Sequence, residues 1–222
     1  LTHTLIDFLM GENDGIPKDP TYIYQLYVAL GNYPQAAKTA VIIARQEQDL
    51  GNYSQAHSVL YETIIKLHDH GVHVPRSLRA PFILLQTYFI AGRLAKKGEH
   101  DHAARLLVRI AKHASKFPSN VANVLTLAVI ECQRAGLKNA SYEYAGVLMR
   151  PDHRHNIDPK FKRKIENMIR RPPKKDEEPT ADPEEATSPC PFSGQAIPRT
   201  ELVCPTTHVD TPSCAYPRAH RE

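Results

Sequence analysis

The sequence predicts an all-α fold in which helical hairpins form a solenoid, followed by an irregular tail that contains cysteines. Three observations support this prediction. A short glycine-containing block recurs along the chain, apolar residues recur at helical spacing between the blocks, and the composition changes near residue 171. The chain of 222 residues is 41% hydrophobic, which is enough to bury one sizeable core.

The recurring block is Leu-Gly-Asn-Tyr-x-Gln-Ala, which occupies residues 30–36 and again residues 50–56. A weaker copy lies at 97–103, and a fourth at 135–140 keeps only the glycine. The alternative is an ordinary helical bundle in which these blocks arose by chance. Two near-identical blocks so close together favour repeated hairpins. We therefore predict a TPR-like α-solenoid over residues 1–171.

Each position of the block has an expected structural role. The glycine follows a helix and is expected to adopt a positive φ there; the four are Gly31, Gly51, Gly98 and Gly136. Pro34 suits the first turn of the next helix, and Ser54 is expected to cap the helix of the second block. The alanine five residues after the glycine is expected to let two helices approach closely. These alanines are Ala36, Ala56 and Ala103, and Ser141 stands at the fourth position.

The apolar periodicity and the short connections predict a run of antiparallel neighbouring helices. One clear case is the i, i+3, i+4, i+7 spacing of Ala37, Ala40, Val41 and Ala44. Helices are expected near residues 20–30, 34–49, 54–70, 78–96, 100–115, 119–135, 138–149 and 158–170. No alternating pattern in this part of the chain predicts a strand.

The last predicted helix lies in a basic segment. Residues 150–175 contain ten Lys or Arg and three Asp or Glu, so their net charge is +7. Asp158 is expected to cap the helix, whose apolar side is Phe161, Ile165, Met168 and Ile169. One interpretation is a docking or membrane-surface helix. The interpretation we favour is a capping helix of the solenoid with a solvated basic face.

Composition and motifs exclude several classes of function. A net charge of only +4 does not indicate nucleic-acid binding. No apolar run is long enough for a transmembrane segment. Four cysteines are too few for a secreted disulfide scaffold, and Cys132 is expected to be buried in a helix. No phosphate loop or nucleophile motif is present, and the histidine clusters lack metal-ligand spacing, so no catalytic, cofactor-binding or metal-binding residue is predicted.

Beyond residue 171 the composition predicts a Pro-rich and acidic linker over residues 172–189. Residues 190–222 are expected to be either a degenerate zinc ribbon or a disordered tail. A zinc ribbon needs two Cys-x-x-Cys motifs, called knuckles, so that four thiolates bind the metal. Two such motifs begin at Cys190 and Cys204, but Ser193 and Thr207 stand where the second cysteine of each would be needed. The remaining candidate ligands for zinc would be Cys190, Cys204, His208 and Cys214.

Several long non-repetitive strings resemble a WD-repeat subunit of intraflagellar transport complex A (IFT-A). The first is Leu-Ile-Asp-Phe-Leu-Met-Gly-Glu-Asn-Asp-Gly-Ile-Pro-Lys-Asp-Pro at residues 5–20. Further matching strings lie at 115–119, 129–132, 134–139, 148–151, 170–172 and 185–192. The resemblance covers nearly the whole chain. It implies the C-terminal end of such a subunit, where a TPR-like solenoid precedes a small cysteine-rich terminus.

The resemblance also implies a function, partners and a location. The function is that of a structural scaffold that supports retrograde transport in cilia, ciliary entry of membrane cargo and cilium assembly. The partners are other IFT-A subunits, together with ciliary membrane cargo or its adaptors. The location is the cilium or flagellum and the basal body, on the cytoplasmic side. This chain departs from the family at Ser193 and Thr207, where the family pattern has paired Cys-x-x-Cys knuckles.

Because both knuckles are incomplete, the purified chain is expected to carry no stoichiometric zinc. Elemental analysis after dialysis against a weak chelator measures this directly, and we expect well under about one zinc ion per chain. One zinc ion per chain, lost on replacing Cys204 with Ser, would show instead that the remaining thiolates and His208 complete a site.

Overall fold

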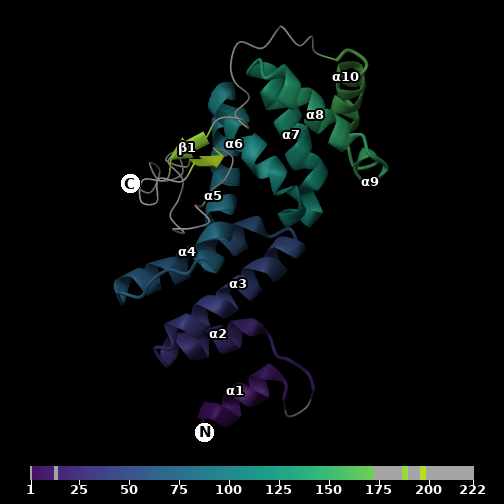
Figure 1. Cartoon of the computed structure of the whole chain (residues 1–222). Helices are drawn as coiled ribbons and strands as arrows, with labels where there is room; N and C mark the ends of the chain where they lie inside the picture. The colour runs from purple at the N-terminus through teal and green to yellow at the C-terminus, as the bar shows by residue number, and fades with distance from the viewer. Residues whose placement is uncertain (1, 13–14, 173–186, 190–195, 199–222) are drawn as a thin grey trace. The chain divides into compact units, whose positions relative to one another are not determined.

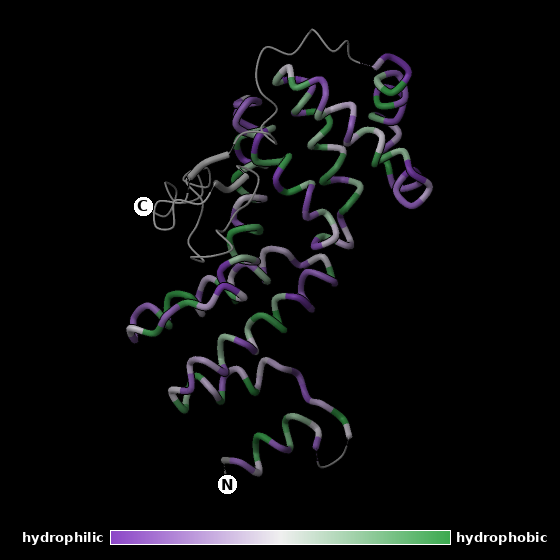
Figure 2. The backbone as a smooth tube through the Cα atoms, in the orientation of Figure 1, coloured by the Kyte–Doolittle hydropathy of each residue, from purple (hydrophilic) through white to green (hydrophobic). Residues whose placement is uncertain are grey.

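The computed structural model describes residues 2–12, 15–172, 187–189 and 196–198 (Figure 1). Its residues fall into two compact units, Leu1–Phe82 and Ile83–Glu222, which are described separately below. Helices make up most of both units, so the all-α prediction is confirmed. Apolar and polar residues alternate along the helices, as expected for helices with one buried face (Figure 2).

Unit 1 is a succession of antiparallel hairpins. Its helices are α1 (Thr2–Met10), α2 (Pro20–Ala29), α3 (Tyr33–Asp49), α4 (Tyr53–Asp69) and the first turns of α5 (Arg76–Lys97). Each of α1, α2 and α3 packs on the helix that follows it. The core between α3 and α4 is built largely of small side chains, among them Ala40 and Ala56, which are both completely buried.

Unit 2 is also built of consecutive helices that pack on one another. It contains the rest of α5, then α6 (His100–Lys112), two 3-10 turns at Ala114–Lys116 and Pro118–Asn120, α7 (Val121–Arg134), α8 (Lys138–Leu148), α9 (Pro151–Arg154) and α10 (Pro159–Ile169). Helix α7 packs between α6 and α8, and α10 packs on α8. Large apolar side chains such as Leu107, Ile110 and Leu125 fill this core and are at most 2% exposed.

The tail contains a short hairpin that the sequence analysis did not predict. Strand β1 (Thr187–Pro189) pairs with β2 (Ala196–Pro198) in antiparallel register, with Ser188 opposite Ile197. Strand β1 falls within the residues expected to be a linker. Most of the predicted linker and tail lies outside the described residues, so that domain assignment remains a prediction.

The predicted glycine corners are present at all four blocks. The φ angles are 67° at Gly31, 85° at Gly51, 84° at Gly98 and 81° at Gly136. In each case the next residue donates its backbone N–H to the carbonyl five residues earlier. One example is Asn32 N–H to Tyr27 O at 2.8 Å, and another is Leu137 N–H to Cys132 O at 2.9 Å. This Schellman arrangement satisfies carbonyls at the end of one helix and reverses the chain into the next.

The fifth residue after each glycine is buried, as predicted from its small size. The exposed fraction is 1% for Ala36 and 0% for Ala56 and Ala103. At the fourth block Ser141 takes this position and is also 1% exposed. Its hydroxyl donates to the carbonyl oxygen of Val129 on α7 at 3.0 Å, which offsets the cost of burying a polar group there.

One capping prediction was wrong. Ser54 lies inside the first turn of α4, and the N-cap residue is Asn52. A single residue, the asparagine, separates each of these glycines from the next helix, so α3 and α4 both begin at the tyrosine that follows the asparagine. In α3 the side chain of Asn32 accepts from Gln35 N–H at 3.4 Å, whereas Asn52 directs its amide to Glu47 at 2.9 Å.

Two other local predictions are confirmed. The Asp158 carboxylate caps α10 and accepts from the backbone N–H of Lys160 at 2.9 Å. Cys132 is completely buried in α7.

Helix α2 begins with an aspartate cap like that of α10. Hydrogen bonds from Thr21 to the Asp19 carboxylate hold the pKa of Asp19 below its ordinary value.

Substitution of two glycines by alanine should have opposite effects on stability. Gly98 has a φ of 84° while Gly92 lies inside α5, and a Cβ atom at either position would meet no atom within 4 Å. Gly98→Ala should therefore lower the free energy of unfolding by about 1–2 kcal/mol, the strain of a left-handed alanine. Gly92→Ala should raise it by about 0.5–1 kcal/mol. Urea denaturation followed by circular dichroism measures both, and equal effects would contradict the proposed role of the corner.

Candidate interaction surfaces

Apolar side chains are exposed mainly on unit 1. Among the described residues, ten of the eleven exposed large hydrophobic side chains lie there, and only Tyr142 lies in unit 2. The ten are Leu5, Phe8, Met10, Ile16, Tyr22, Leu30, Ile42, Leu50, Tyr61 and Ile65. We call them the unit 1 apolar residues. Isolated exposed apolar residues are normal, so what distinguishes unit 1 is the number of them that it carries.

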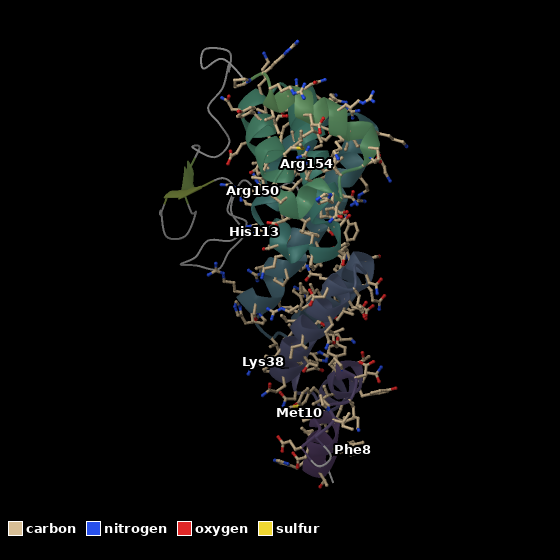
Figure 3. All side chains as sticks on the ribbon, turned by 90° about the vertical axis from the view of Figure 1, so that its right-hand side faces the viewer. Phe8, Met10, Lys38, His113, Arg150 and Arg154 are labelled. Carbon is tan, nitrogen blue, oxygen red and sulfur yellow. The ribbon has the colours of Figure 1, made fainter. Side chains whose placement is uncertain are left out.

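Pairs of the unit 1 apolar residues lie one helical turn apart. Leu5 and Phe8 are each 45% exposed on α1, and Tyr61 and Ile65 are 46% and 40% exposed on α4. Figure 3 shows Phe8 and Met10 on α1. The largest exposed fraction is the 72% of Leu50, at the corner between α3 and α4. Because these side chains are already partly buried, burying the rest of each against a partner would contribute about 1–2 kcal/mol before the costs of association.

A buried carboxylate joins α6 and α7 in unit 2. Glu131 on α7 is only 1% exposed, and its side chain meets His100 Nδ1 at 2.6 Å and an Arg134 guanidinium nitrogen at 2.9 Å. A buried carboxylate needs such partners because desolvation without them is costly. These contacts tie the first residue of α6 to the end of α7. We therefore assign this cluster a structural role.

The remaining histidine clusters do not converge. His102 approaches Glu99 at 3.7 Å, and His68 approaches Asp69 at 3.9 Å, so each lies beside a different carboxylate. No group of three potential metal ligands occurs within the part of the chain that the structure describes. The candidate zinc ligands Cys190, Cys204, His208 and Cys214 lie outside the described residues. The expectation about zinc therefore remains a prediction.

The apolar side of α10 faces the protein. Ile165 is 1% exposed, Phe161, Met168 and Ile169 are half-buried, and α10 packs on α8. The basic residues of α10 therefore point outward from a helix that is anchored through its apolar side. This arrangement agrees with a capping helix, since a helix lying in a membrane surface would need its apolar side exposed. Arg154, labelled in Figure 3, approaches Glu166 of α10 at 3.8 Å.

A basic cleft of about 680 Å³ lies where α7, α8 and α10 meet. Its lining includes the side chains of Lys138, Lys164, Arg170 and Arg171, together with polar and apolar side chains. The other lining residues are Gln133, Ser141, Tyr142, Asn167, Met168 and Pro172. The sequence analysis missed this cleft because its residues come from three helices. The only signal in the sequence was the net charge of +7 over residues 150–175.

None of the described helices combines the length and the apolar character that crossing a bilayer requires.

Comparison with known proteins supports the resemblance found in the sequence. No protein-family model matches the chain. The chain is 45% identical over 220 residues to human WD repeat-containing protein 19 and 46% identical to the mouse protein of that name. It is 33% identical to WD repeat-containing protein dyf-2 of Caenorhabditis elegans. Each alignment covers 99% of this chain.

The chain is similar to WD repeat-containing protein 19 over almost its whole length. It spans only 16% of the length of these relatives. The WD repeats for which they are named form four-stranded propeller blades. In the described residues of this chain the only strands are β1 and β2, three residues each. The described part of this chain is thus helical and contains no such blade.

Removal of Arg134 should destabilise unit 2 more than removal of an exposed arginine. Arg134→Ala removes one of the two groups that contact the buried Glu131 carboxylate. It should lower the free energy of unfolding by about 1.5–3 kcal/mol. The control is Arg105→Ala on α6, since Arg105 pairs with Asp101 and both side chains are about half exposed. Arg105→Ala should lower the free energy of unfolding by only about 0–1 kcal/mol. Equal midpoints for the two variants in urea denaturation would show that the buried cluster does not contribute to stability.

Proposed function

We propose that this chain is part of a structural scaffold subunit of IFT-A that works through protein–protein contacts of its helical hairpins. The observation that supports this most strongly is the similarity to WD repeat-containing protein 19 over 99% of the chain. Repeated helical hairpins offer extended surfaces for binding other proteins. The unit 1 apolar residues supply exposed apolar side chains of the kind that such binding buries.

The proposal includes the cellular role expected of an IFT-A subunit. The chain would support retrograde intraflagellar transport, ciliary entry of membrane cargo and cilium assembly. Its partners would be other IFT-A subunits, with membrane cargo or its adaptors as further partners. It would act in the cilium and at the basal body, on the cytoplasmic side of the membrane. We propose no catalytic activity and no cofactor for this segment.

A second candidate function is membrane-surface binding through the basic segment. The observation in its favour is the outward position of basic side chains on α10, including Lys160 and Arg163. Electrostatic attachment to anionic lipid would add about 1 kcal/mol per basic residue and would weaken with salt. Flotation with phosphatidylserine vesicles at low and high salt separates this candidate from a protein scaffold. Absence of flotation at low salt would exclude it.

Charge introduced among the unit 1 apolar residues should weaken assembly with partner subunits. In Ile42→Glu with Leu50→Glu, two carboxylates replace side chains that are 53% and 72% exposed. Their desolvation in an interface should lower retention of IFT-A subunits at least about tenfold in co-purification. The matched control is Gln35→Glu with Gln46→Glu, which adds the same charge at exposed polar positions of α3.

The control variant should retain the subunits at the level of the unmodified chain. Circular dichroism should show equal helix content in both variants, because all four positions are on the surface. If the unmodified chain retains no IFT-A subunit, the scaffold proposal fails. If both variants retain subunits equally, the binding surface lies elsewhere than at Ile42 and Leu50.

A further inference from the structure

The basic cleft between α7, α8 and α10 is lined by regularly spaced positions of two helices. Along α10 and the residues after it, Lys164, Asn167, Met168 and Arg171 follow i, i+3, i+4, i+7 spacing and so share one side. On α8, the lining residues Lys138, Ser141 and Tyr142 also share one side. Two helix faces therefore border the cleft, and Gln133 at the end of α7 completes its lining.

The charge of the cleft is of one sign. Four of its ten lining residues are Lys or Arg, and none is Asp or Glu. Lys164, Arg170 and Arg171 form no ion pair with any carboxylate in the described ranges. The nearest acid on α10, Glu166, does not line the cleft and lies 3.8 Å from Arg154. Several like charges held around one concave surface favour an anionic ligand.

The N-terminus of α8 adds to the positive electrostatic potential of the cleft. Lys138 is the first residue of this eleven-residue helix, and its N-terminus carries no side-chain cap. Backbone N–H groups of a first helical turn carry partial positive charge, which favours anions nearby. The negative end of the α10 dipole, near Arg170, opposes this effect, so the cationic side chains supply the main attraction.

The remaining lining residues indicate which anion fits. Gln133 and Asn167 carry amides, which can donate to carbonyl groups and accept from N–H groups of a peptide backbone. Tyr142, Met168 and Pro172 offer apolar surface, and Tyr142 is 37% exposed. A fully hydrated inositol phosphate would leave this apolar surface without contact. A concave cleft is also reached more readily by a protruding chain segment than by a flat bilayer.

We propose that this cleft binds an acidic segment of a partner protein, in which Asp or Glu side chains meet the four cations and an interspersed apolar side chain contacts Tyr142 and Met168. A volume of about 680 Å³ is suited to a few residues of an extended peptide. The inference deepens the proposed scaffold function because it names the chemistry of one partner segment. It depends on unit 2 alone and not on the unit 1 apolar residues.

The test is fluorescence polarisation of the full chain with a labelled, glutamate-rich peptide that contains interspersed leucines. We expect binding at low salt that weakens as ionic strength rises. Lys164→Glu with Arg171→Glu reverses two charges in the cleft and should lower affinity at least about tenfold. The matched control, Lys160→Glu with Arg163→Glu, reverses two charges of α10 that do not line the cleft, and should change affinity less than about threefold.

Altered peptides, measured in the same assay, identify which chemical groups of the ligand are bound. The same peptide with glutamine in place of glutamate should lose most of its affinity, and one with alanine in place of leucine should lose part of it. If circular dichroism shows that the charge-reversed variant has unfolded, Lys164→Gln with Arg171→Gln tests the cleft with a smaller perturbation. That variant should also lower affinity relative to Lys160→Gln with Arg163→Gln.

Four results would overturn the inference. One is equal loss of affinity in the cleft variant and its matched control, which would indicate a general effect of basic charge. The others are no peptide binding at low salt, tighter binding of inositol hexakisphosphate than of the peptide, or binding of phosphatidylserine vesicles that is lost in the cleft variant. Failure of co-purification with IFT-A subunits leaves this measurement unaffected, so the two proposals fail separately.

Discussion

The left-handed glycine that ends each hairpin's first helix is the constraint on which the rest of the structure depends. At Gly31, Gly51, Gly98 and Gly136 the positive φ turns the chain back within a connection of two or three residues. The following helix then lies directly against the preceding one, so the residue five positions after the glycine is always buried. Only a small side chain fits at such a close approach, which explains three alanines and one serine at this position.

The two units differ in the side chains that form their cores and their surfaces. Unit 1 has a core rich in alanine and leaves large apolar side chains at its surface, which suits a segment that binds other proteins. Unit 2 has a core of larger side chains, and one carboxylate is buried among its described residues, Glu131, held by His100 and Arg134. The surface of unit 2 is correspondingly more polar, with Tyr142 as its exposed large hydrophobic residue among those described. Exposed apolar side chains and the basic cleft thus lie in different parts of the described chain.

The basic residues after Arg150 show how packing changes the meaning of a charge pattern. In the sequence they form one segment with a net charge of +7. In the fold, burial of Ile165 orients α10, so Lys164 and Arg171 line the cleft whereas Lys160 and Arg163 do not. The same helix therefore offers two chemically similar but spatially distinct sets of cations. Only the set in the cleft is joined by amide and aromatic groups from α7 and α8.

The sequence by itself determined the all-α fold, most helix positions, the glycine corners and the resemblance to IFT-A subunits, because local propensity and repeated blocks are written along the chain. It did not reveal the N-cap role of Asn52, because the length of the corner decides where α4 begins. It also did not reveal the partners of Glu131, which is 31 residues from His100, or the cleft lined by α7, α8 and α10. Those features depend on how helices pack, since packing brings together side chains that no local pattern relates.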